Sequence, residues 1–296
     1  MGLPDSTARA RELGAELRHA RETIGLSGVE MARRLGWSHS KVSRMESGQR
    51  SASEVDTAIY LSSCGVARAE LERLLELARQ ADDGYWVRPH GQALPDELRS
   101  LVIQESTATS ITSFELSRIN GLLQTEEYAR ALLYDSPLES LDDIELRVEA
   151  RMARQSLLRR YRPPRLLFYV HEQALRLPVG GARVMHEQVL QLVFTTSLSH
   201  CSVRVVPTAA GAHPGLAGPF FLMRYDEHQP VVYVENETAS VFLETPEDIS
   251  TYRRILARLA EVALDEGQSR EWLAELASEY DRAEDGSRCV PASTPV

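Results

Sequence analysis

The sequence predicts an all-α N-terminal domain of five helices, followed by a larger mixed α/β (α+β) domain. Up to residue 81, apolar residues recur at helical spacing, whereas the pattern further along mixes helix-like and strand-like runs. The length of 296 residues suggests about two domains. We expect these domains at 1–81 and 96–283, with a linker at 82–95 that holds two glycines and two prolines, and a disordered tail at 284–296.

Three of the five expected helices follow from apolar periodicity alone. The first spans residues 8–24, another begins at Ser53, and the last spans 67–81. The residues that we expect to face the core are Leu13, Leu17, Ala20 and Ile24 in the first, Val55, Ile59 and Tyr60 in the second, and Leu71, Leu74, Leu75 and Ala78 in the last.

Residues 27–48 predict the remaining two helices, which are short and meet at Gly36. Ser27 is a suitable N-cap, and Glu30 stands three residues later, where it completes a capping box. Ser38 caps the second helix, over 38–46, whose apolar Val42 and Met45 share one face and leave polar side chains outside. This is the layout of a helix-turn-helix, in which the second helix enters a DNA groove. An ordinary helical hairpin is the alternative, but the flanking helices also fit a helix-turn-helix domain.

Base contacts are expected from the second short helix. In a helix-turn-helix, residues near the start of that helix meet base edges, and Arg or Lys with guanine is the commonest specific contact. The candidates for reading bases are His39, Ser40, Lys41 and Arg44.

Residues 13–66 resemble the Xre-type domain of phage-repressor-like regulators. The matching segments are 25–27 (Gly-Leu-Ser), 35–38 (Leu-Gly-Trp-Ser) and 42–48 (Val-Ser-Arg-Met-Glu-Ser-Gly). The resemblance implies a structural ion pair between Arg21 and Glu46. It also implies a phosphate contact just after the first cap, where relatives often carry glutamine and this chain has Gly28. We expect the phosphate contacts from Ser27, Gly28, Arg33, Gln49 and Arg50.

The charge is unevenly divided along the chain. Its formal net charge is −10, but residues 9–52 hold nine Lys or Arg against five Glu. Phosphate neutralisation is local, so an acidic second domain is compatible with binding to double-stranded DNA, although it weakens that binding. Three scattered cysteines indicate a reducing compartment, and we see neither a membrane-length apolar run nor a signal peptide. We therefore expect a cytoplasmic protein, without membrane contact, that associates with the nucleoid when bound to DNA.

The second domain alternates strand-like runs with long amphipathic segments. Strands are expected at 110–116, 166–171, 202–206, 220–225 and 231–235. Helices are expected at 125–133, 141–161, 182–198, 246–264 and 269–280.

Segments 121–130, 171–181, 207–218 and 232–235 resemble the C-terminal domain that follows an Xre-type domain in actinobacterial antitoxin-like regulators. Asn120 stands where relatives usually have proline. The resemblance implies a transcriptional regulator that is often paired with a small protein encoded nearby, and it supplies no ligand.

Two regions of this domain are candidate ligand or partner surfaces. One joins His171, Glu172 and Arg176 to His213 in the Gly- and Pro-rich loop 211–219, whose glycines could instead serve turns. The other holds seven arginines within 147–165, Arg151 and Arg154 among them. It suits an acidic partner or a second DNA contact, or else it is a solvated helix face paired with the domain's own carboxylates.

No constellation predicts catalysis, a metal or a cofactor. His200 beside Cys201 is a poor chelating pair, Glu235, Glu237 and Glu244 lack partner motifs, and a lone Gly-Gly at 180–181 is a weak anion site. We expect no enzymatic activity.

The leading functional hypothesis is a sequence-specific DNA-binding transcriptional regulator. It would act as a homodimer that places two recognition helices in successive major grooves, about 34 Å apart, while the C-terminal domain senses a small protein or ligand. The alternative is an antitoxin-like protein-interaction module that neutralises a small partner and binds DNA for autoregulation.

Overall fold

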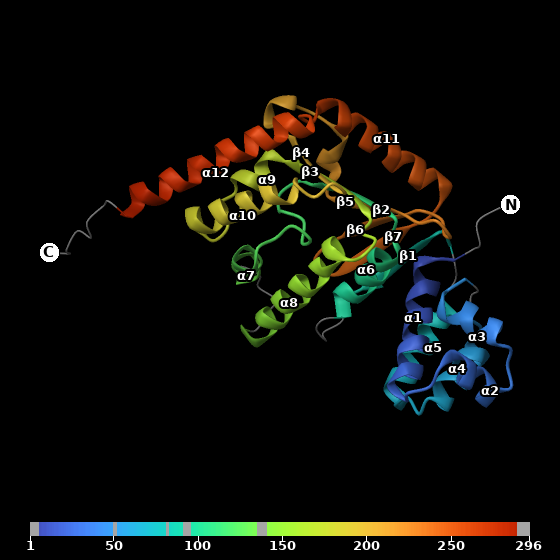
Figure 1. The fold of residues 1–296 in the computed structure, drawn as a ribbon. Helices are drawn as coiled ribbons and strands as arrows, with labels where there is room; N and C mark the ends of the chain where they lie inside the picture. Colours follow the sequence, from blue (N-terminus) through green and yellow to red (C-terminus); the bar gives the residue numbers. More distant parts are fainter. Residues whose placement is uncertain (1–5, 50–51, 81–82, 91–95, 135–140, 289–296) are drawn as a thin grey trace. The chain divides into compact units, whose positions relative to one another are not determined.

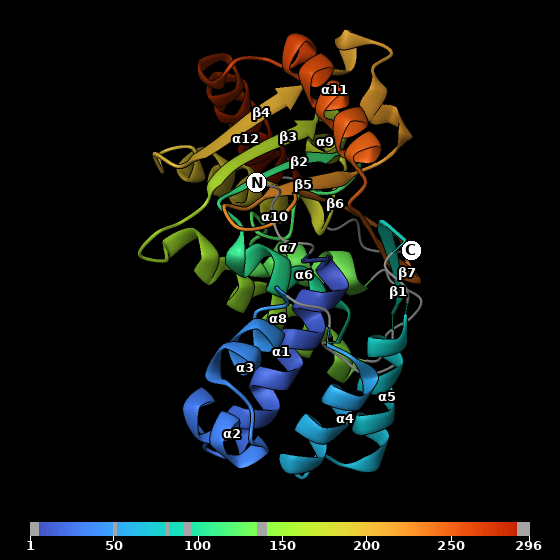
Figure 2. The same ribbon diagram turned by 90° about the vertical axis from the view of Figure 1, so that its right-hand side faces the viewer.

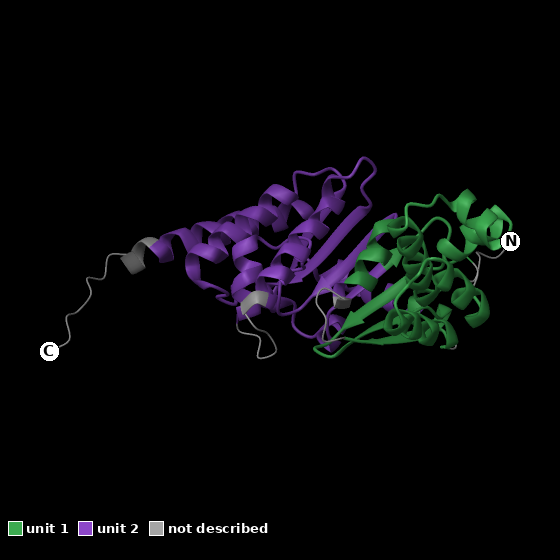
Figure 3. Ribbon diagram, turned by 90° about the horizontal axis from the view of Figure 1, so that it is seen from below, with its two compact units in different colours: residues 1–90, 99–108, 223–249 green, residues 91–98, 109–222, 250–296 purple. Residues whose placement is uncertain are grey.

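The computed structural model describes residues 6–49, 52–80, 83–90, 96–134 and 141–288 (Figure 1). The chain forms two compact units, coloured separately in Figure 3. Unit 1 comprises residues 1–90, 99–108 and 223–249, and unit 2 comprises 91–98, 109–222 and 250–296. In the ranges described, no helix combines the length and the hydropathy that crossing a membrane requires.

Unit 1 begins with the helical region predicted from the sequence. Serine or threonine hydroxyls cap the first four helices, where Thr7, Ser27, Ser38 and Ser53 each accept a hydrogen bond from the amide three residues later. Leu17, Met31, Met45, Tyr60 and Leu74 are buried between the helices. These are α1 (Ala8–Thr23), α2 (Gly28–Leu35), α3 (His39–Glu46), α4 (Glu54–Ser63) and α5 (Arg68–Arg79).

The predicted inward face of α4 is only partly correct. Tyr60 is buried as expected, but Val55 is 67% exposed and Ile59 is 44% exposed. Because α4 begins at Glu54, its buried stripe holds Thr57, Tyr60 and Leu61, and Val55 and Ile59 fall one turn apart outside that stripe. Ile24, expected to be the last core residue of the first helix, is the C-cap of α1 and is also exposed.

The rest of unit 1 comes from distant parts of the chain. Strands β6 (Val231–Glu235) and β7 (Ala239–Leu243) form an antiparallel pair, and β1 (Tyr85–Pro89) adds to the far side of β7 with Trp86 opposite Phe242. The two rings stack with their centres 5.0 Å apart. Helix α6 (Asp96–Thr107) contributes residues 99–107 to the unit.

Two expected irregular segments contain regular structure. Strand β1 lies inside the expected linker 82–95, of which residues 82 and 91–95 are outside the described ranges. Helix α12 (Glu266–Arg288) extends into the expected tail 284–296, of which residues 289–296 are outside the described ranges.

Unit 2 is built on parallel strands, which lie side by side in Figure 2. Strand β3 (Arg165–His171) lies between β2 (Ser110–Glu115) and β4 (Cys201–Val206), and both pairings are parallel. Strand β5 (Phe220–Arg224) carries the chain from unit 2 into unit 1. All five predicted strands are therefore present, whereas β1 and β7 escaped prediction.

Helices cover the sheet of unit 2. Helices α10 and α12 pack against each other and against β4, with Met185, Leu192 and Leu273 fully buried. Helices α7 and α8 form a smaller cluster of Ala129, Leu133, Ile144 and Val148. The α-helices described in this unit, besides α12, are α7 (Glu126–Tyr134), α8 (Leu141–Arg154), α9 (Glu172–Arg176), α10 (Gly181–Thr195) and, from residue 250 onward, α11 (Pro246–Val262).

Candidate DNA-binding surface

Helices α2 and α3 form the helix-turn-helix that the sequence predicts. The capping box is complete, because Ser27 accepts from the amide of Glu30 while the Glu30 carboxylate accepts from the amide of Ser27. Gly36 ends α2 with a φ of 67°, a left-handed conformation that glycine adopts without a Cβ clash. Val42 and Met45 are buried, so α3 presents its other face outward.

Three of the four candidate base-reading residues are exposed on α3. His39 and Ser40 occupy its first turn, and Arg44 lies one turn further along. The Nε of Arg44 donates to the carbonyl of Ser40 at 3.2 Å, which leaves its remaining N–H groups at the surface. Ser43 is exposed beside them and was not among the candidates.

Lys41, the fourth candidate, is engaged within the domain. Its Nζ lies 2.7 Å from Oδ1 of Asp56 on α4 and 3.7 Å from the centre of the Trp37 ring. A base contact by Lys41 therefore requires the ammonium to leave both partners.

Arg21 and Glu46 form a bidentate, buried ion pair that fastens α1 to the end of α3. The Nε–Oε1 and Nη2–Oε2 distances are 2.8 and 2.7 Å, and the Tyr60 hydroxyl donates to the same carboxylate at 2.6 Å. Burial opposes ionisation of Glu46, yet hydrogen bonds from Arg21 and Tyr60 keep its pKa below the ordinary value. Burial and the bond to Glu46 raise the pKa of the Tyr60 hydroxyl.

The candidate phosphate contacts lie in different environments. Ser27 and Gly28 begin α2, with Ser27 exposed, and Arg33 is exposed at its end. Gln49 is half-buried and donates from Nε2 to Glu227 at 3.2 Å. Arg50 lies outside the described residues.

A polar pocket of about 320 Å³ opens between α1, α2 and α3. Gly28 and His39 bring the starts of α2 and α3 to it, and Ser43 adds a hydroxyl. Arg18 of α1 also lines it, with about half of its side chain exposed, and sequence reasoning overlooked this residue. Its position three residues before Arg21, on the same face of α1, was the available signal. The pocket lining also includes the carboxylates of Glu22 and Glu46, which lie 3.5 and 2.7 Å from Nη2 of Arg21, so the acidic groups of the pocket are paired with an arginine.

The number of basic residues in 9–52 overstates the positive charge that α1 exposes for contact with DNA. Arg9, Arg11 and Arg21 are buried, and they are three of the nine basic residues in 9–52. Among the described residues of this region, the basic side chains classed as exposed are those of Arg18, Arg33, Arg34 and Arg44.

Close backbone packing makes the position of α3 depend on α1. A Cβ on Gly14 would lie 2.6 Å from the carbonyl oxygen of Met45 and 2.8 Å from that of Glu46. At Gly48, just after α3, a Cβ would lie 2.7 Å from the Cα of Arg11. These two glycines let α1 lie directly against the C-terminal end of α3.

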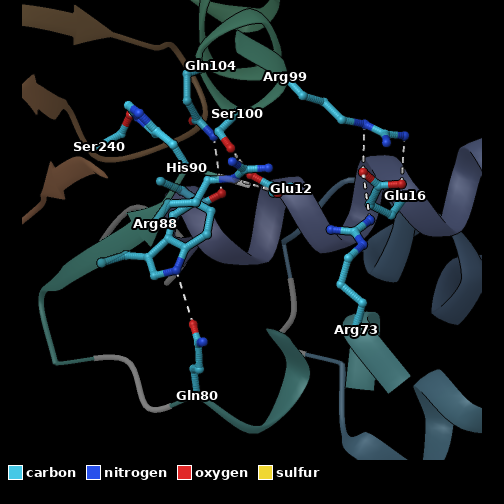
Figure 4. Close-up of polar contacts among 12 residues, drawn as sticks. Glu12, Glu16, Arg73, Gln80, Arg88, His90, Arg99, Ser100, Gln104 and Ser240 are labelled. Atoms are coloured by element: carbon cyan, nitrogen blue, oxygen red, sulfur yellow. Dashed lines mark hydrogen bonds and ion pairs between the residues drawn. The ribbon is translucent and has the colours of Figure 1, made fainter. Parts of the chain in front are cut away.

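Buried carboxylates of α1 bind arginines from β1, α5 and α6 (Figure 4). Glu12 accepts from Nε of Arg88 at 3.2 Å and from the hydroxyl of Ser100. Glu16 pairs with Arg99 at 2.7 Å and with Arg73 at 3.6 Å. Burial raises the pKa of Glu16, although both arginines oppose that shift.

The start of α1 is held in the same way by α6 and by the residue after β7. Nε of Arg11 donates to Gln104 at 2.7 Å, and Gln104 in turn donates to the carbonyl of Ala8 at 3.1 Å. The carboxylate of Glu244 accepts from the amide of Ala8 at 2.9 Å and lies 3.6 Å from Arg11. Helix α1 is thus joined on one side to the recognition helix and on the other to β1, α6 and β7.

The structure brings the other candidate residues, His171, Glu172, Arg176 and His213, together in unit 2. The His171 and His213 rings lie 5.5 Å apart. Glu172 accepts from the amide of Thr208 at 2.8 Å and pairs with Arg176 at 2.7 Å. Burial lowers the pKa of both histidines, and each ring nitrogen of His213 is buried without a hydrogen-bond partner among the described residues.

Arg151 and Arg154 do not form an exposed surface. Arg154 is buried, with its guanidinium beside Gly121, and Arg151 is half-buried and donates to Gln124 at 3.3 Å. The expectation that they lie on a partner-facing surface is therefore wrong for Arg154, because α8 turns this side chain toward the 119–124 segment. The exposed arginines of the cluster come later, after α8 ends.

Comparison with known proteins identifies two regions. A family model described as a helix-turn-helix domain matches residues 12–74, and one described as a domain of unknown function (DUF5753) matches residues 98–275. A search of curated proteins and of solved structures finds no match. The second region contains Arg99, Ser100, Gln104 and Glu244, so the side chains that hold α1 come partly from it.

Proposed function

Because the chain belongs to the DUF5753 family and carries a helix-turn-helix domain ahead of that region, we propose that it is a sequence-specific, DNA-binding transcriptional regulator. It acts by binding rather than by catalysis, on the nucleoid in the cytoplasm. The helix-turn-helix is of the Xre type, and α3 enters the major groove of double-stranded DNA.

The outer face of α3 is the observation that carries this proposal. His39, Ser40, Ser43 and Arg44 are exposed there, and the opposite face is buried. Each of these side chains can donate a hydrogen bond, and the arginine fork suits the O6 and N7 acceptors of guanine.

Phosphate binding is assigned to the pocket beside α3. Its lining combines Arg18, His39, Ser43 and the start of α2 at Gly28, where backbone N–H groups and the helix dipole favour an anion. The two carboxylates of the lining, Glu22 and Glu46, are both paired with Arg21. Arg33 and Gln49 extend the contact along the phosphate backbone. Such contacts position the protein, whereas α3 reads the bases.

The regulator works as a homodimer on a two-fold site, with its two copies of α3 about 34 Å apart. The C-terminal region receives the signal, from a small protein or a ligand that prefers one state of the dimer. The buried ion pairs of α1 support this coupling, because a shift of α6 or β7 necessarily disturbs the helix on which α3 rests.

Selection from a random duplex library tests the proposal. We expect the full chain to enrich one motif with two-fold symmetry, and Arg44→Ala to lose that enrichment. Arg68→Ala is the matched control, because Arg68 is an exposed arginine on α5 that pairs, among the described residues, with Glu72 on its own helix. Absence of an enriched motif, or equal loss in both variants, would rule out base reading by α3.

A further inference from the structure

A group of exposed arginines surrounds an exposed tyrosine just before β3 of unit 2. Tyr161 is 95% exposed, and Arg159, Arg162 and Arg165 are exposed around it in sequence. The guanidinium carbon of Arg162 lies 5.8 Å from the centre of the Tyr161 ring. The short 3₁₀ helix η1 (Gln155–Arg159) and the strand β3 hold the two ends of this segment.

The three exposed arginines of this segment carry positive charge that no carboxylate compensates within the described part of the chain. There, no carboxylate lies within 4.0 Å of the guanidinium nitrogens of Arg159, Arg162 or Arg165. Elsewhere in the unit, Arg130 and Arg183 are half-buried or exposed and each contacts a glutamate. The alternative that these arginines are paired with carboxylates of their own domain therefore does not hold for Arg159, Arg162 and Arg165.

Exposed apolar side chains lie at the same end of the sheet. Strands β3 and β4 are parallel, with Leu166 opposite Cys201, so the segments that precede them lie at the same end of the sheet (Figure 2). Nε2 of His200 lies 3.1 Å from the carbonyl of Leu158, which joins the two segments directly. Leu198 is 37% exposed in the segment before β4, and Phe194 is 66% exposed one turn earlier.

We propose that this β3–β4 patch, formed by Arg159, Tyr161, Arg162, Arg165, Phe194 and Leu198, is a docking surface for an acidic segment of another protein. Tyrosine, phenylalanine and arginine are among the residues enriched in protein interfaces, and tyrosine and arginine are among those that supply the strongest contacts. The planar guanidinium fork binds carboxylates in a bidentate manner.

Duplex DNA fits the patch less well than an acidic protein does. The stacked bases of a duplex offer no partner for Phe194, Leu198 and the Tyr161 ring, so only the arginines would contribute. An acidic protein segment uses both kinds of side chain. This inference rests on the proposed role of the C-terminal region as the receiver of a protein signal. It places the binding site for the signalling protein at the end of unit 2 where β3 and β4 begin.

Site-specific photocrosslinking identifies the occupant. The full chain, with p-benzoylphenylalanine in place of Tyr161, is expressed in its native cell and irradiated, and the products are identified by mass spectrometry. The same probe in place of Arg253, an exposed residue of α11, is the control. We expect a protein of net negative charge to crosslink at 161 and not at 253. Crosslinking to DNA, to a second copy of the chain or to nothing would overturn the proposal.

Binding of the purified partner then tests the chemistry. We expect Arg159→Glu with Arg162→Glu to weaken affinity for the crosslinked protein by at least about tenfold, and Tyr161→Ala to do the same. The charge-matched pair Arg253→Glu with Arg254→Glu should leave the affinity within about twofold. Equal losses in the two double variants, or no effect of Tyr161→Ala, would reduce the patch to non-specific attraction and overturn the proposal.

The same variants separate this inference from the proposed function. The patch variants should retain the DNA affinity of the unmodified chain, because α3 is unchanged in them. If the unmodified chain bound its partner through the patch but no DNA, the proposed function alone would fail.

Discussion

The buried carboxylate of Glu12 should contribute more to stability than any exposed charge of α1. In Glu12→Gln, the guanidinium of Arg88 and the hydroxyl of Ser100 lose the anion that they contact. The side chains of Glu12 and Arg88 are 2% and 8% exposed, so the cation cannot turn to water without moving β1. Removing one member of such a buried pair costs about 3–5 kcal/mol.

Two measurements report this loss: urea unfolding of the full chain, and hydrogen exchange of the α1 amides in the folded protein. A decrease of about 3 kcal/mol corresponds to roughly 150-fold faster exchange through opening of α1. The control is Glu22→Gln on the same helix, because the Glu22 side chain is mostly exposed and lies 3.5 Å from Arg21. We expect the control to change stability by less than about 1 kcal/mol. If the two variants exchanged at the same rate, α1 would not depend on its contacts with β1 and α6.

Four further variants test other parts of the structure. Gly14→Ala forces a Cβ to within 2.6 Å of the Met45 carbonyl, so thermal unfolding should show a loss of about 1–3 kcal/mol. Glu46→Gln should remove the part of the acid-labile stability of unit 1 that Glu46 provides, because a lowered carboxyl pKa stabilises the fold above the ordinary value of 4.5 and that stability is lost as pH falls through the folded pKa. A pH series of urea midpoints that kept the wild-type acid limb would contradict this. His213→Phe should likewise flatten the loss of unit 2 stability below pH 6.5, since a lowered histidine pKa stabilises the fold above that value and the stability is lost as pH falls through the folded pKa. Arg44→Ala should weaken specific DNA binding by about 1–3 kcal/mol in titrations at fixed salt, with little change in non-specific binding.

Local chemistry explains why the helix-turn-helix could be predicted closely. Ser27, Glu30, Gly36 and Ser38 fix the ends of α2 and α3 through contacts within four residues, so the sequence contains the whole signal. The five predicted strands were equally accessible, because each is a run of β-branched or aromatic residues. Arg21 and Glu46 were paired through the resemblance, and the structure places them in contact.

The missed elements depend on partners far along the chain. Strand β1 ends at Pro89 and would read as a linker without β7, which follows about 150 residues later. The burial of Glu12 and Glu16 was equally inaccessible, because acidic residues on a helix normally face water and their arginine partners come from β1, α5 and α6. For the same reason, the number of basic residues in 9–52 could not reveal that Arg9 and Arg11 are buried.

The sequence predicted where the candidate residues lie on their helices better than it predicted what their side chains contact. Helical phase placed the side chains of His39, Ser40 and Arg44 on the exposed face of α3. It could not show that the Lys41 ammonium would contact Asp56 and Trp37. In the arginine-rich segment, the end of α8 divides inward-facing Arg154 from exposed Arg159 and Arg162, and the sequence extended that helix to residue 161.

Base reading by α3 is tested most directly by genome-wide DNA occupancy of the tagged full chain in its native cell, beside the same chain carrying His39→Ala and Arg44→Ala. Both substitutions remove exposed side chains of α3 and leave its buried face intact. We expect sharp peaks that share a two-fold motif and disappear in the variant. Peaks that persist unchanged in the variant would contradict base reading by α3.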